Sequence, residues 1–363
     1  MSAEFFAPEL KVEVNGTRLA ADVSKNITDV SVTLAAGAID ELTLTVANPY
    51  PLMPWTHGDK ADLFQEGVGV KISMGYVDAL QLLFDGEITG LAPSFPEGGT
   101  PTLQVTGQSR LHRLLPGTKR RTFAKMTDQQ IVQKIAGEAG LTASADATDV
   151  TFEHVEQNGT DFDFLQERAR RIRYELWMEG TVLHFGKPRD MGGKAYTLVW
   201  GRTAKAFDPE MKTMPLRSFT PTMETREQVG EVIVRGTNPA TGEKIEGKAA
   251  AGDEEGKMGG TSTGPAVAEK AFGKKTTLFV NEPVTSQAEA DERAKAIFND
   301  RALRFVTGRG ATIGLPDLKP GMVVEIDGVG PRFSGDYYVT RTTHSLGGGG
   351  YRTDFSARRN SVG

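Results

Sequence analysis

Two acidic residues, Asp161 and Asp163, form the carboxylate pair best suited to acid–base catalysis. Neighbouring acids can share one proton and act as general acid and general base. The same residues stand where a helix is expected to begin, and carboxylates at that place cap free amides and offset the positive end of the helix dipole. The capping interpretation needs no substrate, so we favour it and predict no catalytic residue.

The other spacings that could bind a cofactor or a metal ion are incomplete. Residues 242–249 have the glycines and the lysine of a phosphate-binding loop, but Ala249 replaces the hydroxyl that holds magnesium. The 5 histidines are scattered, and none has a second histidine or carboxylate three or four residues away. Cysteine is absent, which excludes thiolate ligands, thiolate nucleophiles and disulfides. We therefore expect no cofactor and no metal ion.

The charge balance argues against general binding of polyanions. The chain has 42 Lys and Arg residues against 47 Asp and Glu residues, a net charge of −5. No positive excess is available for nucleic acid or anionic lipid. The N-terminus has no basic and apolar export signal, and no run reaches the ~18 apolar residues of a membrane span. We expect synthesis in a reducing cytosol, without nucleic-acid recognition or membrane insertion by this chain.

One predicted helix has a strongly basic side. Its arginines could follow a phosphate backbone, but Glu167 and Glu175 flank them and no aromatic side chains for base stacking are interleaved. We expect a solvated or subunit-facing helix surface, with contacts to a subunit or partner made by Arg168, Arg170, Arg171 and Arg173. A solvated linker between domains, or alternatively an inter-subunit contact, is expected at Lys119, Arg120 and Arg121.

The elements that position these residues begin with an all-β pattern over residues 1–115. Asn15-Gly16 supplies the positive φ angles of a tight hairpin turn. Residues 41–47 alternate apolar and threonine side chains, as in a strand with one buried face. Further strand-like runs are separated by Gly, Pro and Ser clusters, which indicates a small barrel or sandwich.

Residues 116–200 change to a helical period and are predicted to form an α/β middle domain. Thr127 and Gln130 make a capping box before one helix, and Thr160 or Asp161 caps a second. Two extended runs then turn around Glu179-Gly180. The side chains expected to anchor the second helix and fill the adjoining core are Phe162, Phe164, Leu165 and Trp177.

The last third returns to β structure after an interruption. Residues 237–275 have few large apolar side chains, so we predict a long flexible loop. Ser286 and Glu289 make a capping box for a helix over residues 286–307, and residues 240–305 are expected to join the middle domain. Residues 201–236 and 308–363 are assigned to a second β unit. The predicted fold class is mixed and β-rich, with β, α/β and β units in turn.

Several segments together resemble a known family. Residues 157–165, the basic helix, residues 174–177 and residues 183–186 resemble the middle-domain signature of contractile-tail baseplate hub proteins. These are the late control protein D family of phages and the hub part of VgrG-type spikes. Residues 318–321, 335–339 and 350–355 look like the family's last barrel, and residues 83–89 like an early strand turn. The matching residues include Gln157, Thr160, Asp161, Phe162, Asp163, Phe164, Leu165, Trp177, Gly335, Tyr338, Gly350 and Tyr351.

The resemblance implies a non-enzymatic homotrimer. Each subunit would contribute two tail-tube-like β-barrels, so that six barrels match the hexameric inner tube on one face and a trimeric spike on the other. The implied partners are the inner tail tube protein, a separate spike protein and other baseplate proteins. The protein would be made in the bacterial cytoplasm and incorporated in the baseplate of a phage tail or contractile injection particle.

Two other function classes compete with the hub. A tail-tip peptidoglycan hydrolase would need a carboxylate pair in a cleft. A receptor-binding tip protein would bind cells without the tube. Release of cell-wall fragments would identify the first, and binding to whole cells the second.

Overall fold

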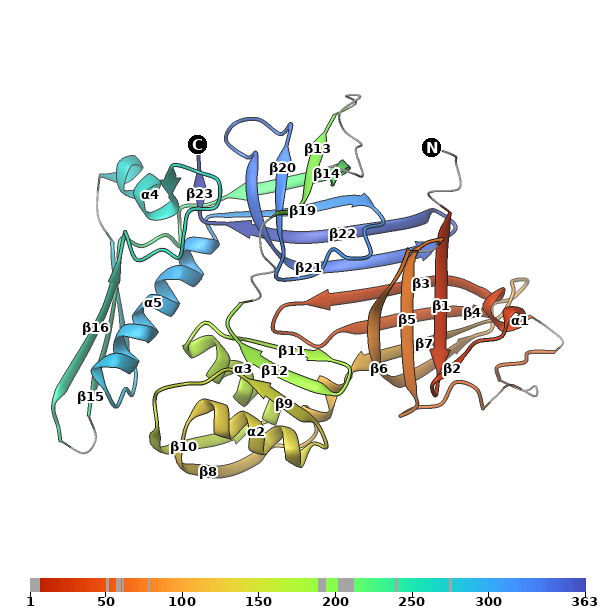
Figure 1. The fold of residues 1–363 in the computed structure, drawn as a ribbon, viewed down its shortest axis with the longest axis horizontal. Helices are drawn as coiled ribbons and strands as arrows, with labels where there is room; N and C mark the ends of the chain where they lie inside the picture. The colour runs from red at the N-terminus through yellow and green to blue at the C-terminus, as the bar shows by residue number, and fades with distance from the viewer. Residues whose placement is uncertain are drawn as a thin grey trace.

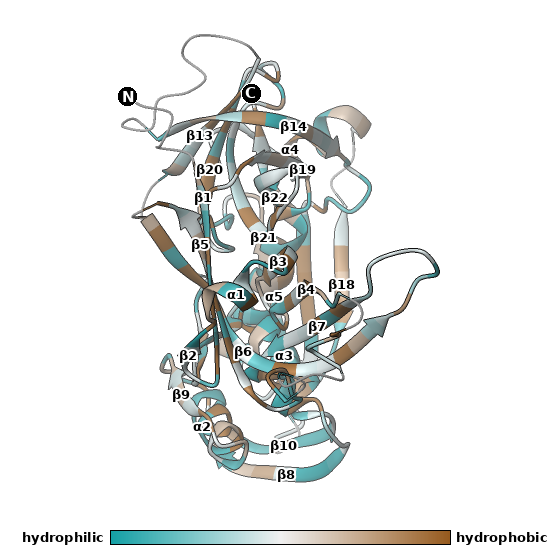
Figure 2. Ribbon diagram, turned by 90° about the vertical axis from the view of Figure 1, so that its right-hand side faces the viewer, coloured by the Kyte–Doolittle hydropathy of each residue, from teal (hydrophilic) through white to brown (hydrophobic). Residues whose placement is uncertain are grey.

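The computed structural model describes residues 7–363 apart from 50–51, 57–59, 61, 78, 189–193, 202–211, 239–240 and 274–275. The chain is β-rich, with 50% strand and 17% helix, which confirms the predicted fold class. Hydrophobic and hydrophilic residues alternate along many of its strands (Figure 2), so each sheet buries one face. Figure 1 shows two β units side by side, with the helices of residues 128–303 on one side of them.

The first β unit is an antiparallel sheet with the order β1-β5-β6-β7-β4-β3. Its turn at Asn15 and Gly16 has φ angles of 51° and 73°, as the sequence predicted, and pairs β1 with β2. The short helix α1 is Ala21–Ser24. The strands are β1 (Pro8–Val14), β2 (Thr17–Arg18), β3 (Ile27–Ala35), β4 (Glu41–Ala47), β5 (Gly69–Tyr76), β6 (Ala79–Ser94) and β7 (Thr102–Ser109).

The second β unit closes into a six-stranded barrel. Its pairings run β21-β20-β13-β14-β19-β22, and β22 pairs again with β21. The strands are β13 (Lys194–Trp200), β14 (Thr213–Met223), β19 (Val306–Ile313), β20 (Val323–Asp327), β21 (Gly335–Gly347) and β22 (Gly350–Arg359). Strand β13 was expected in the middle domain, but parallel pairing with both β14 and β20 places it in this barrel.

The two β units share a strand order. When the six long strands of each unit are numbered 1 to 6 in chain order, neighbouring strands follow the order 1-4-5-6-3-2 in both units. One strand differs, because β1 runs antiparallel to β5 whereas β13 runs parallel to β20. The structure therefore contains the duplication that the β, α/β, β pattern predicted.

The units are joined into one sheet at a seam formed by β3 and β21. In the second barrel, β14 closes the ring by pairing with β13. The corresponding strand of the first unit, β3, pairs with β21 instead. The antiparallel register runs from Arg341 opposite Ala35 to Leu346 opposite Val30. Hydroxyl pairs Ser31–Ser345 and Thr33–Thr343 lie 3.4 and 3.1 Å apart across it.

The middle domain packs two helices against short strands around a separate core. Thr127 and Gln130 form the predicted capping box of α2, and Thr160 accepts the Asp163 amide at the start of α3. The elements are η2 (Arg110–Leu114), β8 (Lys119–Met126), α2 (Asp128–Glu138), β9 (Thr142–Ala145), β10 (Phe152–Gly159), α3 (Asp161–Arg171), β11 (Glu175–Glu179) and β12 (Val182–Gly186).

A fourth unit contains much of the segment that was predicted to be a flexible loop, and that prediction is wrong. Strands β16, β15 and β18 form a sheet whose core face is covered by α5. Ser286 caps α5 as predicted, but the Glu289 carboxylate accepts from Thr285 instead of Ser286. The elements are β15 (Glu231–Thr237), β16 (Lys244–Ala250), β17 (Ser262–Thr263), α4 (Gly264–Phe272), β18 (Thr277–Asn281), α5 (Gln287–Leu303) and, paired with β17, β23 (Ser361–Val362).

Close packing explains why this segment has so few large side chains. A Cβ added to Gly247 on β16 would lie 2.1 Å from the backbone carbon of Ala290 on α5. Ala249 and Ala290 are fully buried in the same contact. The small residues let the helix approach the sheet. A segment of small residues has the composition of a loop, which is why the sequence prediction is wrong here.

Candidate assembly surfaces

The candidate acid pair is divided between two environments. Asp161 is buried and accepts from Lys119 Nζ at 2.6 Å, Arg121 Nη2 at 2.8 Å and Gln157 Nε2 at 2.8 Å. Burial acts to raise the pKa of Asp161, but the hydrogen bonds from Lys119 and Gln157 and the charges of Lys119 and Arg121 together hold that pKa below its ordinary value. Asp163 is exposed and belongs to the helix cap. This arrangement favours the structural interpretation of the pair.

The prediction of a solvated linker at residues 119–121 is wrong for two of its three residues. Lys119 and Arg121 lie on β8 and form ion pairs with Asp161. Because β8 pairs with β10, its basic side chains point toward the start of α3. They fix the position of that helix.

The basic side of α3 contacts other parts of the same chain. Arg168 is buried, its Nε lies 2.5 Å from Asp128 Oδ1, and its guanidinium stacks 4.2 Å from the Phe152 ring centre. The expected surface role therefore fails at Arg168. Two further arginines form ion pairs across to the fourth unit, Arg171 with Glu289 at 3.1 Å and Arg173 with Glu255 at 2.5 Å. Arg170 is exposed, and its contact with a partner stays a prediction.

The apolar anchors of α3 lie where they were expected, with one exception. Phe162, Phe164 and Leu165 are buried, and the Phe164 ring stacks on Phe123 with centres 5.5 Å apart. Trp177 is half-buried and does not fill the core, which corrects the prediction. The reason is strand alternation on β11, because Leu176 and Met178 point inward and the residue between them points outward.

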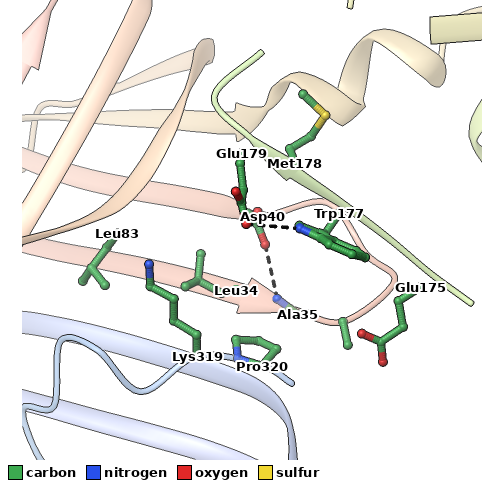
Figure 3. A pocket seen from close by; sticks show the side chains of 11 residues that line it. Leu34, Ala35, Asp40, Leu83, Glu175, Trp177, Met178, Glu179, Lys319 and Pro320 are labelled. Carbon is green, nitrogen blue, oxygen red and sulfur yellow. Dashed lines mark hydrogen bonds between the residues drawn. The ribbon is translucent and has the colours of Figure 1, made fainter. Parts of the chain in front are cut away.

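Trp177 lines a small pocket where the first unit, the middle domain and the second barrel meet. Its ring stacks on His184 at 4.9 Å, and its Nε1 donates to Glu179 at 3.3 Å. Figure 3 shows Lys319 and Pro320 of the second barrel on the opposite side of this space. The pocket has a volume of about 120 Å³ and holds three carboxylates, Asp40, Glu175 and Glu179. No group of three or more metal-binding side chains is found among the residues that the structure describes.

The motif residues of the last barrel act in packing and turns. Gly350 has a φ of 83° in the turn between β21 and β22, where a side chain would be strained. A Cβ on Gly335 would lie 2.7 Å from Arg359 Nη1. The Tyr338 hydroxyl donates to Glu175 Oε1 at 2.7 Å, which joins this barrel to the middle domain. Tyr351 is on β22, yet it is buried in the core of the first unit.

Two polar clusters that the sequence did not single out join the units. Glu87 on β6 is buried and contacts His112 Nε2 at 2.8 Å and Arg113 Nε at 3.1 Å, both from η2. His344 on β21 lies next to the Tyr351 hydroxyl at 3.1 Å and donates from Nε2 to the Leu318 carbonyl at 3.0 Å. The sequence signal for the Glu87 cluster is the run of basic residues in η2, directly after β7.

Several large hydrophobic side chains are exposed and could contact neighbouring proteins. Isolated exposed hydrophobics are common on monomers, so only their grouping would mark an interface. Val77 and Leu82 belong to one hairpin of the first unit, and Phe272 and Phe279 to the fourth unit. The remaining members of the set are Leu52, Phe95, Leu115 and Trp200.

Solved structures share this architecture over nearly the whole chain. The 43 kDa tail protein of prophage MuSo2 from Shewanella oneidensis has a TM-score of 0.68 at 14% sequence identity, with 97% of this chain and 98% of that chain covered. The tail protein from Neisseria meningitidis MC58 has a TM-score of 0.69 at 13% identity, with 98% of each chain covered. The E. coli c3393 protein, a component of the type VI secretion system, has a TM-score of 0.59 at 13% identity, with 97% of this chain and 77% of that chain covered.

Residues 7–347 match the family model described as the Alg8 N-terminal domain. The chain belongs to that family. No curated protein matches the sequence. The identities to the solved structures are low, so this member of the Alg8 N-terminal domain family shares with them the fold of phage tail proteins, and the expected resemblance holds at that level. None of the helices in the described part of the chain is long and apolar enough to cross a bilayer.

Proposed function

We propose that this protein is a non-enzymatic, homotrimeric hub in the baseplate of a contractile tail or injection particle. The observation that carries the proposal is the repeated strand order of the two β units. The hub would adapt a hexameric inner tube to a trimeric spike. Solved proteins with this fold include two tail proteins and a type VI secretion component described as similar to T4 tail proteins gp27 and gp5.

The repeat gives a physical reason for the adaptor role. Three copies of a chain with two related β units present six similar units around one axis. Such a ring has true threefold symmetry, which a trimeric spike can match, and approximate sixfold symmetry, which a hexameric tube can match. A chain with a single β unit would need six copies, and its ring would offer a trimeric spike two equivalent orientations instead of one.

The seam supports the same role, because it fixes the angle between the two units. A main-chain ladder over six residue pairs joins β3 to β21, and the Tyr76 hydroxyl donates to the Gly314 carbonyl at 2.9 Å. A ring of six units closes only if neighbouring units keep a constant orientation. A rigid seam within the chain meets that requirement for three of the six junctions.

The proposed partners are the inner tail tube protein, a separate spike protein and other baseplate proteins. The proposed location is the baseplate, after synthesis in the bacterial cytoplasm. The role requires neither nucleic-acid recognition nor insertion into a membrane.

The test is the copy number in isolation and in the particle. Multi-angle light scattering should give a hub mass of three times the 39.2 kDa chain mass. The measurement is made on the protein alone and on the protein co-expressed with its tube and spike proteins. Imaging of particles should place three copies on the central axis. One or six copies on the axis would overturn the proposal, as would release of fragments from purified cell walls by the protein alone.

A further inference from the structure

A groove of about 1150 Å³ lies where α3, α5 and the second barrel meet. Its walls come from the C-terminal end of α3, one side of α5 and the strands β20, β21 and β22, and Ala36 and Gly37 of the β3–β4 turn lie at its rim. Figure 1 shows these elements around the middle of the molecule. The groove is thus bordered by all four units.

The groove is basic, although the chain is acidic. Seven of its lining residues are Lys or Arg and four are Asp or Glu, which leaves a local excess of three positive charges in a chain of net charge −5. Charges that line a concave wall act together on a bound group more strongly than charges scattered over a convex surface. The excess favours an anionic occupant.

Part of this positive charge is not neutralised within the chain. Arg173, Arg304 and Arg358 form ion pairs with acids of the groove, and Arg293 pairs with Glu282, which lies outside the groove lining. Arg170 and Lys187 are exposed, and neither has an ion pair among the described residues. These two side chains can turn toward a ligand without breaking an ion pair to any residue that the structure describes.

The remaining wall is partly apolar. Ile172 on the α3 side and Ile297 and Leu303 on α5 line the groove and are half-buried. An acidic peptide with apolar side chains could use both kinds of wall, since guanidinium groups pair with carboxylates in bidentate geometry. A long nucleic acid would gain little from the apolar wall, and the surrounding negative charge would repel it.

We propose that this groove binds an acidic segment of a neighbouring protein in the particle, with Arg170 and Lys187 as its main charge contacts. The identity of the neighbour rests on the proposed function, but the chemistry of the groove does not. Direct peptide binding tests the groove alone, so its failure would leave the trimer and copy-number test unaffected.

The probe is a fluorescent dodecapeptide of repeating Glu-Asp-Leu, measured by anisotropy with the full chain at about 0.03 M and about 0.3 M salt. The comparison probes are the same peptide with Gln and Asn in place of its acids, and a single-stranded oligodeoxynucleotide of twelve bases. The variant R170E/K187E should bind the acidic peptide at least about tenfold more weakly. The matched control K25E/K244E reverses two exposed lysines outside the groove and should bind like the wild type.

The expected result is salt-sensitive binding of the acidic peptide that the neutral peptide does not show. Equal binding by the two double variants, or equal binding of the acidic and neutral peptides, would overturn the proposal. Tighter binding of the oligonucleotide through Arg170 and Lys187 would also overturn it and identify a nucleic acid as the occupant. If thermal melting shows that R170E/K187E is unfolded, R170Q/K187Q takes its place in the same comparison.

Discussion

His344 shows how a single buried side chain makes the seam sensitive to pH. Its Nε2 must carry the proton, because the Leu318 carbonyl can only accept, so Nδ1 is left to accept from the Tyr351 or Thr353 hydroxyl. Both ring nitrogens are therefore satisfied in the neutral form. A second proton, on Nδ1, would require one of these hydroxyls to turn from donor to acceptor. Burial lowers the pKa of His344 to about 4 from its ordinary value of 6.5, with a smaller contribution from Lys319.

We expect the stability of the protein to fall as the pH falls from 6.5 to 4. In that window the unfolded chain binds a proton at His344 and the folded protein does not, so acid favours unfolding by roughly 3 kcal/mol in all. Above pH 6.5 the group contributes no pH dependence. The variant H344Q should lose this part of the slope in urea unfolding at several pH values, whereas H154Q, at an exposed histidine, should keep it. An identical slope in both variants would show that His344 does not titrate in this way.

A second prediction at the residue scale concerns Phe164. The side chain is 8% exposed and stacks on Phe123 in the middle-domain core. F164A should lower the free energy of unfolding by about 3–5 kcal/mol, because it removes buried apolar area and leaves a cavity. F95A, at a side chain that is 55% exposed, should change it by no more than ~0.5 kcal/mol. A thermal melt of F164A that matches wild type would contradict the assignment of this anchor.

Among the elements, β16 and α5 depend on one glycine. G247A would place a Cβ 2.1 Å from the Ala290 backbone carbon, so α5 must move away from the sheet. We expect hydrogen exchange to become faster in β16 and α5 while both β units keep their protection. G137A is the matched control, because Gly137 is exposed on α2 with nothing within 4 Å, and alanine there should raise stability by about 0.5–1 kcal/mol. Unchanged exchange in α5 of G247A would mean that the close contact is not required.

Over the whole molecule, the structure predicts that the two β units unfold together. They share the β3–β21 ladder, and Tyr351 of the second barrel lies in the core of the first unit, 5% exposed and 5.8 Å from the Tyr76 ring. Y351A should cost about 3–5 kcal/mol and separate the single calorimetric transition into two. F355A removes a ring from the core of the second barrel itself and should lower the transition without dividing it. Two independent transitions in the wild type would contradict the coupling.

The sequence by itself determined the features that depend on a few neighbouring residues. The Asn15-Gly16 turn, the Thr127 and Thr160 caps and the alternation along β4 were predicted because turn geometry, capping and side-chain period act over one to four residues. The β-rich class followed from the same local signals.

Only the tertiary structure decided which distant segments meet. The pairing of β3 with β21 joins residues about 310 positions apart, and no local pattern specifies it. Arg168 was expected at the surface because its partner Asp128 is 40 residues away. Gly247 looked like part of a loop because its close contact with Ala290 is made only after the chain has folded back. Such contacts depend on the shape of the whole molecule, and hydrophobic period and turn residues do not encode them.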